Sequence, residues 1–195
     1  LLARRGEAIV ALPGGCAIGP RPVDLHLAGL KSLGAEIELR HGYVVARARR
    51  LRGATIRMAG SDGPTVTGTA NVLSAAVLAE GTTIIEDAAI EPEIVALGEM
   101  LLGMGANIDG LGTSILRIEG VERLGGVRQR IIPDRIEAAT LLLAGAITGG
   151  TVRVVGTVPE HLAAVCVLLD QSGCRVVVEG NAVTVHGADR LQGVD

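Results

Sequence analysis

A cysteine on a glycine-rich loop is the part of this sequence best suited to chemistry. Residues 13–23 read Pro-Gly-Gly-Cys-Ala-Ile-Gly-Pro-Arg-Pro-Val, with the thiol at Cys16. Glycines allow backbone conformations that other residues resist, so the loop can expose and move the thiol. A reactive cysteine also needs a nearby positive charge, which Arg21 can supply. These residue types favour acid, nucleophilic or anion-binding chemistry over a purely structural role.

The composition indicates what kind of folded domain positions this loop. The chain has 195 residues, of which 48% are hydrophobic and 20% charged, so it can bury a sizeable core. There is no Phe, no Trp and a single Tyr. We therefore expect Ala, Val, Leu and Ile to fill the core.

Several classes of function fit the composition poorly. The lack of aromatic side chains argues against base stacking, and the net charge of −3 argues against nucleic acid and membrane-surface partners. No apolar stretch reaches the length of a membrane span. The cysteines, Cys16, Cys166 and Cys174, are odd in number and lack CxxC spacing, so we expect no disulfide framework, no metal site and a reducing, cytoplasmic location. No GxGxxG, P-loop or HExxH motif occurs, and we expect no cofactor.

The chain contains an internal repeat of about seventy residues. Three segments share a proline at the start of a helical pattern, an acidic residue in the first turn and a glycine at the end; they span residues 22–37, 92–108 and 159–176. The prolines are 70 and 67 residues apart, and the glycines 71 and 68. Proline suits the first position of a helix and glycine the position after its end. Each segment is expected to continue into a hairpin, with turns at His41-Gly42, Asp109-Gly110 and Gly180-Asn181.

A second, almost wholly apolar kind of helix alternates with the first. It is predicted at Thr65 to Leu78 and at Asp134 to Ile147, and such apolar helices are buried on most sides. Each leads through a glycine into a strand. The repeating unit is therefore strand, buried helix, strand, helix, strand, strand, and the fold class is α/β with buried helices ringed by sheets.

Four stretches resemble a known family, the UDP-N-acetylglucosamine 1-carboxyvinyltransferases, which are enolpyruvyl transferases of peptidoglycan synthesis. The stretches are residues 12–26, 65–93, 118–126 and 133–137. The resemblance implies an inside-out α/β barrel of two similar domains, each a threefold repeat. It identifies residues 1–130 as the later part of the first domain, with the Cys loop, and 131–195 as the beginning of the second. The chain then corresponds to the central portion of the enzyme.

The resemblance also implies an activity. The family transfers the enolpyruvyl group of phosphoenolpyruvate to the 3-hydroxyl of UDP-N-acetylglucosamine and releases phosphate, the first committed step of peptidoglycan synthesis, on which cell shape and division depend. Cys16 matches the family's proton donor, which also forms an adduct with phosphoenolpyruvate and is alkylated by fosfomycin. The implied partners are these two small molecules, without nucleic acid or membrane.

The resemblance assigns nucleotide-sugar contacts to two segments. In the first, Arg21 between two prolines suits a diphosphate. In the second, the sequence departs from the family, with Ala59 in place of a common Lys and Asp62 in place of an apolar residue. The implied substrate-binding residues are Arg21, Pro22, Val23, Asp24, Leu25, Gly60, Ser61, Asp62 and Gly63.

Other polar residues are assigned structural roles. Asp134 is a natural helix N-cap, and the charged residues at equivalent helix starts are read as structural as well. Cys166 and Cys174 are expected in the core or its packing. The four histidines lack metal spacing and are expected at the surface or as caps. The residues covered by these statements are Glu91, Glu93, Asp134, Arg135, Glu137, Cys166, Cys174, His26, His41, His161 and His186.

Three alternatives remain open on the sequence. The shikimate-pathway enolpyruvyl transferase shares the implied fold but lacks this Cys loop. A non-catalytic binding or assembly module would explain the departures at Ala59 and Asp62. A thiol redox protein is disfavoured because no resolving cysteine lies near Cys16.

Overall fold

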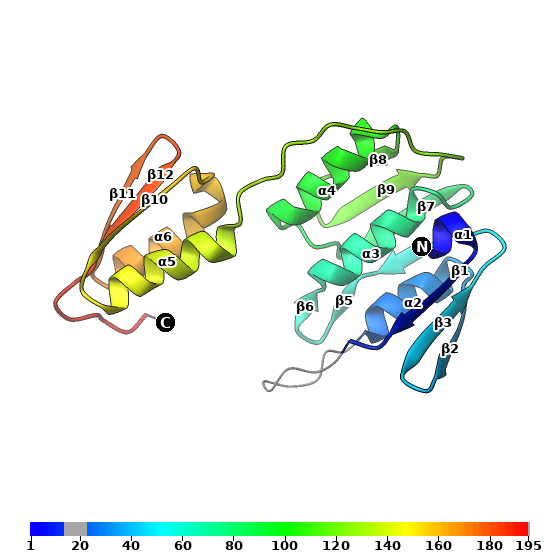
Figure 1. Ribbon diagram of the computed structural model, residues 1–195, viewed down its shortest axis with the longest axis horizontal. Helices are drawn as coiled ribbons and strands as arrows, with labels where there is room; N and C mark the ends of the chain where they lie inside the picture. The colour runs from blue at the N-terminus through cyan, green and yellow to red at the C-terminus, as the bar shows by residue number, and fades with distance from the viewer. Residues whose placement is uncertain (14–22, 195) are drawn as a thin grey trace. The chain divides into compact units, whose positions relative to one another are not determined.

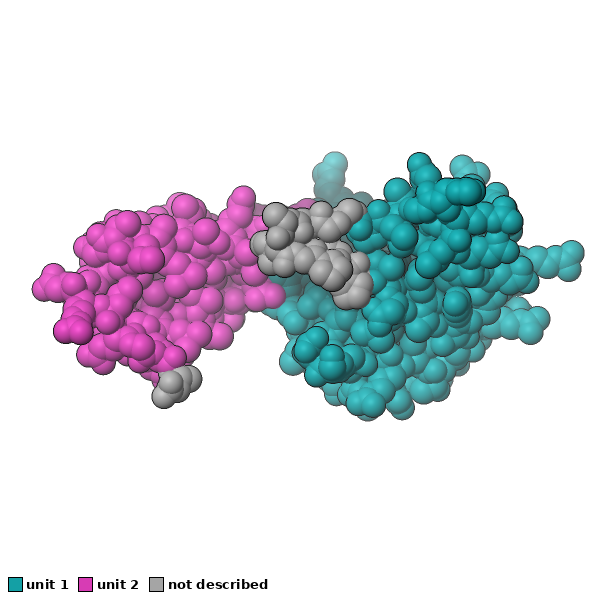
Figure 2. Space-filling model, turned by 90° about the horizontal axis from the view of Figure 1, so that it is seen from below, with its two compact units in different colours: residues 1–129 teal, residues 130–195 magenta. Residues whose placement is uncertain are grey.

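The computed structural model describes residues 1–13 and 23–194. The chain divides into two compact units, Leu1–Gln129 and Arg130–Asp195 (Figure 2). Each has its own group of buried apolar residues. The assignment of these units to the later part of one transferase domain and the opening of another stays a prediction.

Unit 1 opens with a three-stranded antiparallel sheet and one covering helix (Figure 1). The strands run in the order β1-β3-β2. The β2–β3 hairpin turns at His41 and Gly42, with φ of 49° and 80°, which confirms the predicted two-residue turn. The elements are α1 (Leu2–Arg5), β1 (Glu7–Ala11), α2 (Asp24–Ser32), β2 (Glu36–Arg40) and β3 (Tyr43–Arg47).

The rest of unit 1 is one complete copy of the predicted repeat. Its four-stranded sheet has the order β4-β7-β9-β8, and β4 pairs with β7 in parallel because α3 connects them. A short hairpin, β5–β6, lies between β4 and α3. The elements are β4 (Thr55–Arg57), β5 (Ala59–Gly60), β6 (Gly63–Pro64), α3 (Val66–Ala76), β7 (Thr82–Glu86), α4 (Pro92–Gly103), β8 (Asn107–Asp109) and β9 (Ile115–Glu119).

Unit 2 is a third copy of the repeat without its first strand. Residues 120–134 form no strand, so β10 is an edge of its sheet, whose order is β10-β12-β11. The predicted helix from Pro159 begins as a 3-10 turn before it becomes α-helical. The elements are α5 (Arg135–Ile147), β10 (Thr151–Val155), η1 (Pro159–Leu162), α6 (Ala163–Gln171), β11 (Arg175–Glu179) and β12 (Ala182–His186).

The predicted glycine stops are confirmed in all three copies. Gly34, Gly105 and Gly173 follow α2, α4 and α6 with φ of 92°, 97° and 94°. In each case the next residue donates its N–H to a carbonyl of the last turn, as Ala35 does to Leu30 at 3.0 Å. This bond closes a helix only when the preceding residue is left-handed, which is why glycine occupies the position.

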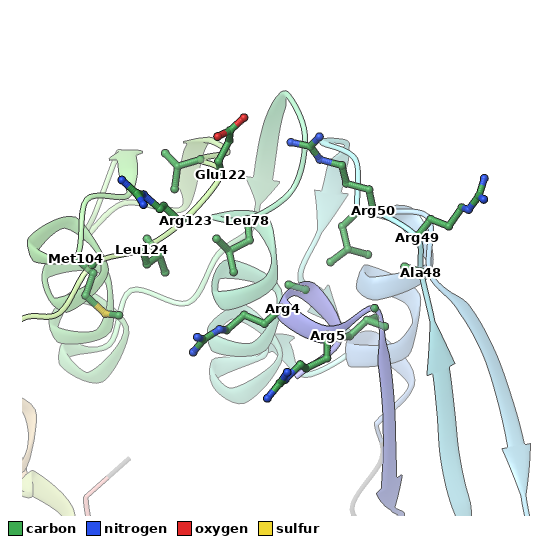
Figure 3. Close-up of a pocket in the computed structure, with 16 residues that line it drawn as sticks. Arg4, Arg5, Ala48, Arg49, Arg50, Leu78, Met104, Glu122, Arg123 and Leu124 are labelled. Atoms are coloured by element: carbon green, nitrogen blue, oxygen red, sulfur yellow. The ribbon is translucent and has the colours of Figure 1, made fainter.

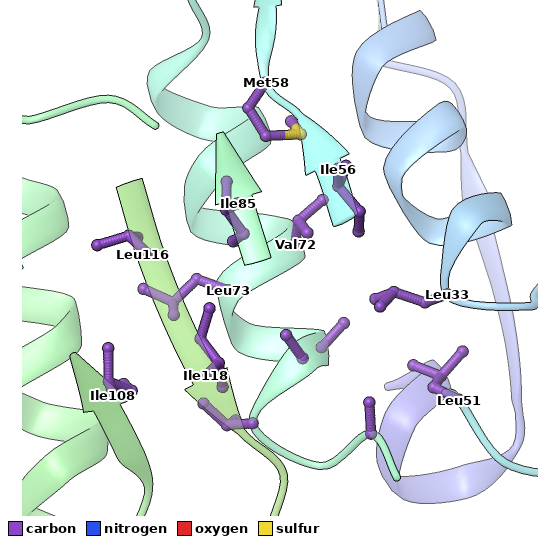
Figure 4. Close-up of a cluster of buried hydrophobic side chains, with 14 of the residues drawn as sticks. Leu33, Leu51, Ile56, Met58, Val72, Leu73, Ile85, Ile108, Leu116 and Ile118 are labelled. Atoms are coloured by element: carbon purple, nitrogen blue, oxygen red, sulfur yellow. The ribbon is translucent and has the colours of Figure 1, made fainter. Parts of the chain in front are cut away.

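The core of unit 1 is aliphatic, as predicted. α3 lies against the four-stranded sheet and contributes Val72 and Leu73, both fully buried, opposite Ile85 and Ile118 (Figure 4). Met58, at 0% exposure, is the one buried residue of this core with a thioether side chain. Such side chains fill the space between closely packed helices and strands without any aromatic ring.

The predicted burial is confirmed for one apolar helix and wrong for the other. α3 packs between α2 and α4 and exposes only a narrow stripe of small polar side chains. Within unit 2, α5 has the sheet on one side and α6 and η1 as its helical neighbours. Its outer face therefore keeps four apolar side chains exposed: Ile136, Leu141, Leu143 and Ile147.

Candidate functional site

The structure describes only part of the predicted site. The catalytic candidate Cys16 and the binding candidates Arg21 and Pro22 lie outside the described residues. The remaining candidates fall on two short segments of unit 1, namely the start of α2 and the β5–β6 hairpin.

The first segment forms the entry to α2. Val23 is the N-cap residue, and its carbonyl accepts a hydrogen bond from the N–H of Leu27 at 3.0 Å. Asp24 is exposed in the first turn, where the positive end of the helix dipole stabilises its carboxylate. Its negative charge would oppose an anionic ligand at the same place.

The second segment is the tip of the β5–β6 hairpin. Gly60 pairs with Gly63, and the turn between them holds Ser61 and Asp62, both exposed. Ser61 donates its hydroxyl hydrogen bond to the Asp62 carboxylate at 3.3 Å between oxygens. Gly63 has φ of 96°, a conformation that glycine adopts freely and other residues do not. The hairpin thus presents a backbone turn with one hydroxyl and one carboxylate at its tip.

The fold brings the two segments together. A Cβ atom placed on Gly60 would lie 3.5 Å from Cδ1 of Leu25, in van der Waals contact. The two residues are 35 positions apart in the sequence. α3 begins directly after this hairpin and packs along α2, so the contact is a consequence of how the two helices meet.

His26 holds this junction in place. Its Nδ1 lies 3.2 Å from Nδ2 of Asn71, and its Nε2 lies 3.2 Å from Oγ1 of Thr67, both on α3. A neutral ring that accepts at Nδ1 and donates at Nε2 satisfies both neighbours. Burial lowers the pKa of His26, with Asp24 acting in the opposite direction, so the neutral form is favoured. His26 is only half-buried and both contacts are at exposed positions, which agrees with the expectation of a surface role.

An apolar cavity of about 360 Å³ adjoins His26. Pro13 and Val23, which flank residues 14–22, both line it, together with Leu27 and Val10. Its lining suits a packed apolar group better than a phosphate, since it offers few hydrogen-bond donors.

Asp134 and the two other cysteines have structural roles. Asp134 caps α5 by accepting hydrogen bonds from the N–H groups of Ile136 and Glu137 at 2.8 and 3.1 Å, as predicted. Cys174 is buried, which confirms its packing role. Cys166 is half-buried at the edge of the unit 2 core, and burial raises the pKa of its thiol. Neither thiol is arranged for nucleophilic chemistry.

Over residues 1–13 and 23–194, no group of three or more His, Cys, Asp or Glu side chains is placed to hold a metal ion. In the same part of the chain, no helix has the length and apolar character to cross a bilayer.

Comparison with known proteins gives a consistent family. The family model for EPSP synthase (3-phosphoshikimate 1-carboxyvinyltransferase) matches residues 1–195. The UDP-N-acetylglucosamine 1-carboxyvinyltransferase of Acidobacterium capsulatum is 53% identical over 100% of this chain and 44% of its own length. The corresponding enzyme 1 of Symbiobacterium thermophilum is 54% identical, with the same coverage. The chain thus spans less than half the length of these relatives.

Solved structures confirm the predicted fold class. The enolpyruvyl transferase NikO from Streptomyces tendae matches with a TM-score of 0.81 at 26% identity, over 98% of this chain and 46% of that one. EPSP synthase from Acinetobacter baumannii matches with a TM-score of 0.67 at 20% identity, over 96% of this chain and 44% of that one.

Proposed function

The chain belongs to the EPSP synthase family, and we propose that it carries part of the site at which the enolpyruvyl group of phosphoenolpyruvate passes to the 3-hydroxyl of UDP-N-acetylglucosamine. One observation carries the proposal: identity of 53% to a carboxyvinyltransferase runs through the whole chain. The proximity of Leu25 to Gly60 supports it, because one ligand can then touch both binding segments.

Cys16 has the central chemical role in this proposal. Its thiol gives a proton to the methylene carbon of phosphoenolpyruvate, which makes the neighbouring carbon electrophilic. The sugar 3-hydroxyl adds to that carbon with loss of its proton. Loss of a proton from the new methyl group and departure of phosphate then restore the double bond in the product. As a thiolate, Cys16 is also a nucleophile that can bond to the same carbon.

The binding residues hold the nucleotide sugar in this proposal. In this proposal, Arg21 and the free N–H groups at the start of α2 bind the diphosphate. The backbone at Gly60 and the hydroxyl of Ser61 contact the nucleotide sugar from the side of the hairpin. Pro22, Val23, Asp24 and Leu25 line the first side, and Asp62 and Gly63 shape the hairpin tip. Cytoplasmic location belongs to the same proposal, since a working thiol needs a reducing compartment.

Fosfomycin labelling tests the proposal directly. The intact mass is measured after incubation with fosfomycin, with and without UDP-N-acetylglucosamine. We expect a single adduct that forms faster with the sugar and is absent in Cys16→Ser. Cys166 and Cys174 serve as internal controls, because both are at least partly buried and should stay unmodified.

An unlabelled protein with no thermal shift from the nucleotide sugar would overturn this assignment. That result would favour a non-catalytic binding or assembly module, the alternative that the residues Ala59 and Asp62 raise. Labelling that spreads over Cys166 and Cys174 would also count against a specific site at Cys16.

A further inference from the structure

A large pocket lies at the far end of α2 and α3 from the predicted substrate segments. α3 begins beside the β5–β6 hairpin, and Leu78, two residues beyond the end of α3, lines this pocket. Its volume is about 820 Å³, within the range of about 300–1,000 Å³ typical of small-molecule sites. Figure 3 shows its walls, which come from α1, the connection after β3, and the segment after β9.

Arginine is the main charged residue type of these walls. The lining holds five arginines and a single acidic residue, Glu122. Because the whole chain has a net charge of −3, this is a local concentration of positive charge on an acidic protein. We call it the arginine pocket, defined by Arg4, Arg5, Arg49, Arg50 and Arg123.

Most of these guanidinium groups have no partner among the described residues. Arg50 makes a long ion pair with Glu80, at 3.9 Å. Within the part of the chain that the structure describes, Arg4, Arg5, Arg49 and Arg123 form no ion pair and no side-chain hydrogen bond. Like charges that gather without counter-charges repel one another, and a bound anion relieves that repulsion.

The pocket also has an apolar floor. Leu2 and Leu51 are 7% and 2% exposed, and Leu78, Met104 and Leu124 lie between the arginines. A floor of this kind buries a compact apolar or planar group, which a pure surface patch of arginines would not do.

We propose that the arginine pocket binds a small organic polyphosphate, such as a nucleoside triphosphate. Figure 3 shows Arg4 and Arg5 together on α1, Arg50 and Arg123 on two other sides, and Arg49 with its side chain pointing outward from the rim. One phosphate cannot reach all of them, whereas a chain of phosphates on a planar body spans the walls and covers the floor. Each guanidinium offers a planar pair of donors that matches phosphate oxygens.

The test is calorimetric titration of the protein with ATP and, separately, with inorganic tripolyphosphate. We expect saturable binding of both, which weakens as salt is raised. The double variant Arg4→Gln/Arg123→Gln is expected to lose at least tenfold in affinity. Arg40→Gln is the matched control, because Arg40 is an exposed arginine of the same unit outside this pocket, and its affinity should be unchanged.

Three outcomes would overturn the proposal. They are no saturable binding of ATP, a loss of ATP affinity in Arg40→Gln equal to that in the double variant, or displacement of ATP by an equal concentration of UDP-N-acetylglucosamine. The last would place ATP in the predicted substrate segments. Circular dichroism checks that the double variant folds, and Arg49→Gln supplies a second variant if it does not. Fosfomycin labelling of Cys16 is an independent readout, so failure here leaves the proposed transferase function standing.

Discussion

His26 connects two helices at the candidate site. It follows Asp24 and Leu25 in the first turn of α2 and hydrogen bonds to Thr67 and Asn71 on α3. Because α3 begins just after the β5–β6 hairpin, these contacts link the first turn of α2 to the helix that follows the hairpin. Its neutral form suits the two bonds, so protonation should loosen the junction.

The first residue-scale prediction concerns pH. Burial lowers the pKa of His26 from 6.5, so the unfolded chain takes up its proton at a higher pH than the folded chain. Stability should therefore fall as the pH drops below about 6.5. We expect the melting temperature to decrease from pH 7.5 to 5.5, and to decrease less in His26→Gln. Thermal unfolding followed by circular dichroism measures this, with His161→Gln as control. An unchanged pH dependence in His26→Gln would contradict the prediction.

A second residue-scale prediction concerns the hairpin tip. Asp62 is exposed beside the place where the proposal puts a diphosphate, and a like charge about 6 Å away in water costs about 0.7 kcal/mol. Asp62→Asn should therefore bind UDP-N-acetylglucosamine about threefold more tightly. Titration calorimetry measures the change, and Asp109→Asn, at an exposed position of β8, is the control. Unchanged affinity would show that the diphosphate lies elsewhere.

At the scale of elements, the close approach of α2 and α3 positions the site. A Cβ atom on Gly29 of α2 would lie 2.5 Å from Cγ2 of Val72 on α3. Both residues are buried, so neither helix can move away without opening the core. The absence of a side chain at Gly29 thus sets the distance that His26 then spans.

Gly29→Ala tests this packing. The added methyl group must displace the Val72 side chain or push the helices apart, and such overpacking typically costs about 1–3 kcal/mol. Gly126→Ala is a matched control, since a Cβ there would meet nothing within 4 Å. Chemical denaturation measures the free energy of unfolding of both variants. If the helices separate, Gly29→Ala should also weaken nucleotide-sugar binding, and equal stability of the two variants would refute the argument.

At the scale of the whole molecule, stability is divided between two cores. The core of unit 1 combines α3 with sheets from two copies of the repeat, whereas the core of unit 2 contains a single copy. Unit 2 has only 66 residues, a size at which a hydrophobic core gives limited stability. We therefore expect unit 2 to be the less stable of the two.

Adjacent leucines of α5 allow a test of this division. Leu142 is fully buried and Leu141 is 53% exposed. Leu142→Ala should lower the stability of unit 2 by about 2–5 kcal/mol, and Leu141→Ala by no more than about 0.5 kcal/mol. Amide hydrogen exchange reports each unit separately, and protection in residues 1–129 should be unchanged. Loss of protection in unit 1 would show that the two cores unfold together.

The sequence by itself determined the features that depend on neighbouring residues. The repeat, the glycine stops after the helices, the Asp134 cap and the His41-Gly42 turn all follow from local backbone geometry and periodicity. The aliphatic core follows from composition. The proposed chemistry of Cys16 likewise follows from residue types and family resemblance.

Only the tertiary structure decided which distant segments meet. No local pattern marks His26 as the link between α2 and α3, because its partners lie about 40 residues away and on another helix. The arginine pocket likewise collects side chains from three separate segments whose charges look dispersed along the sequence. The exposed face of α5 and the missing first strand of unit 2 have the same cause: burial and strand pairing depend on neighbouring elements, which periodicity within one element does not reveal.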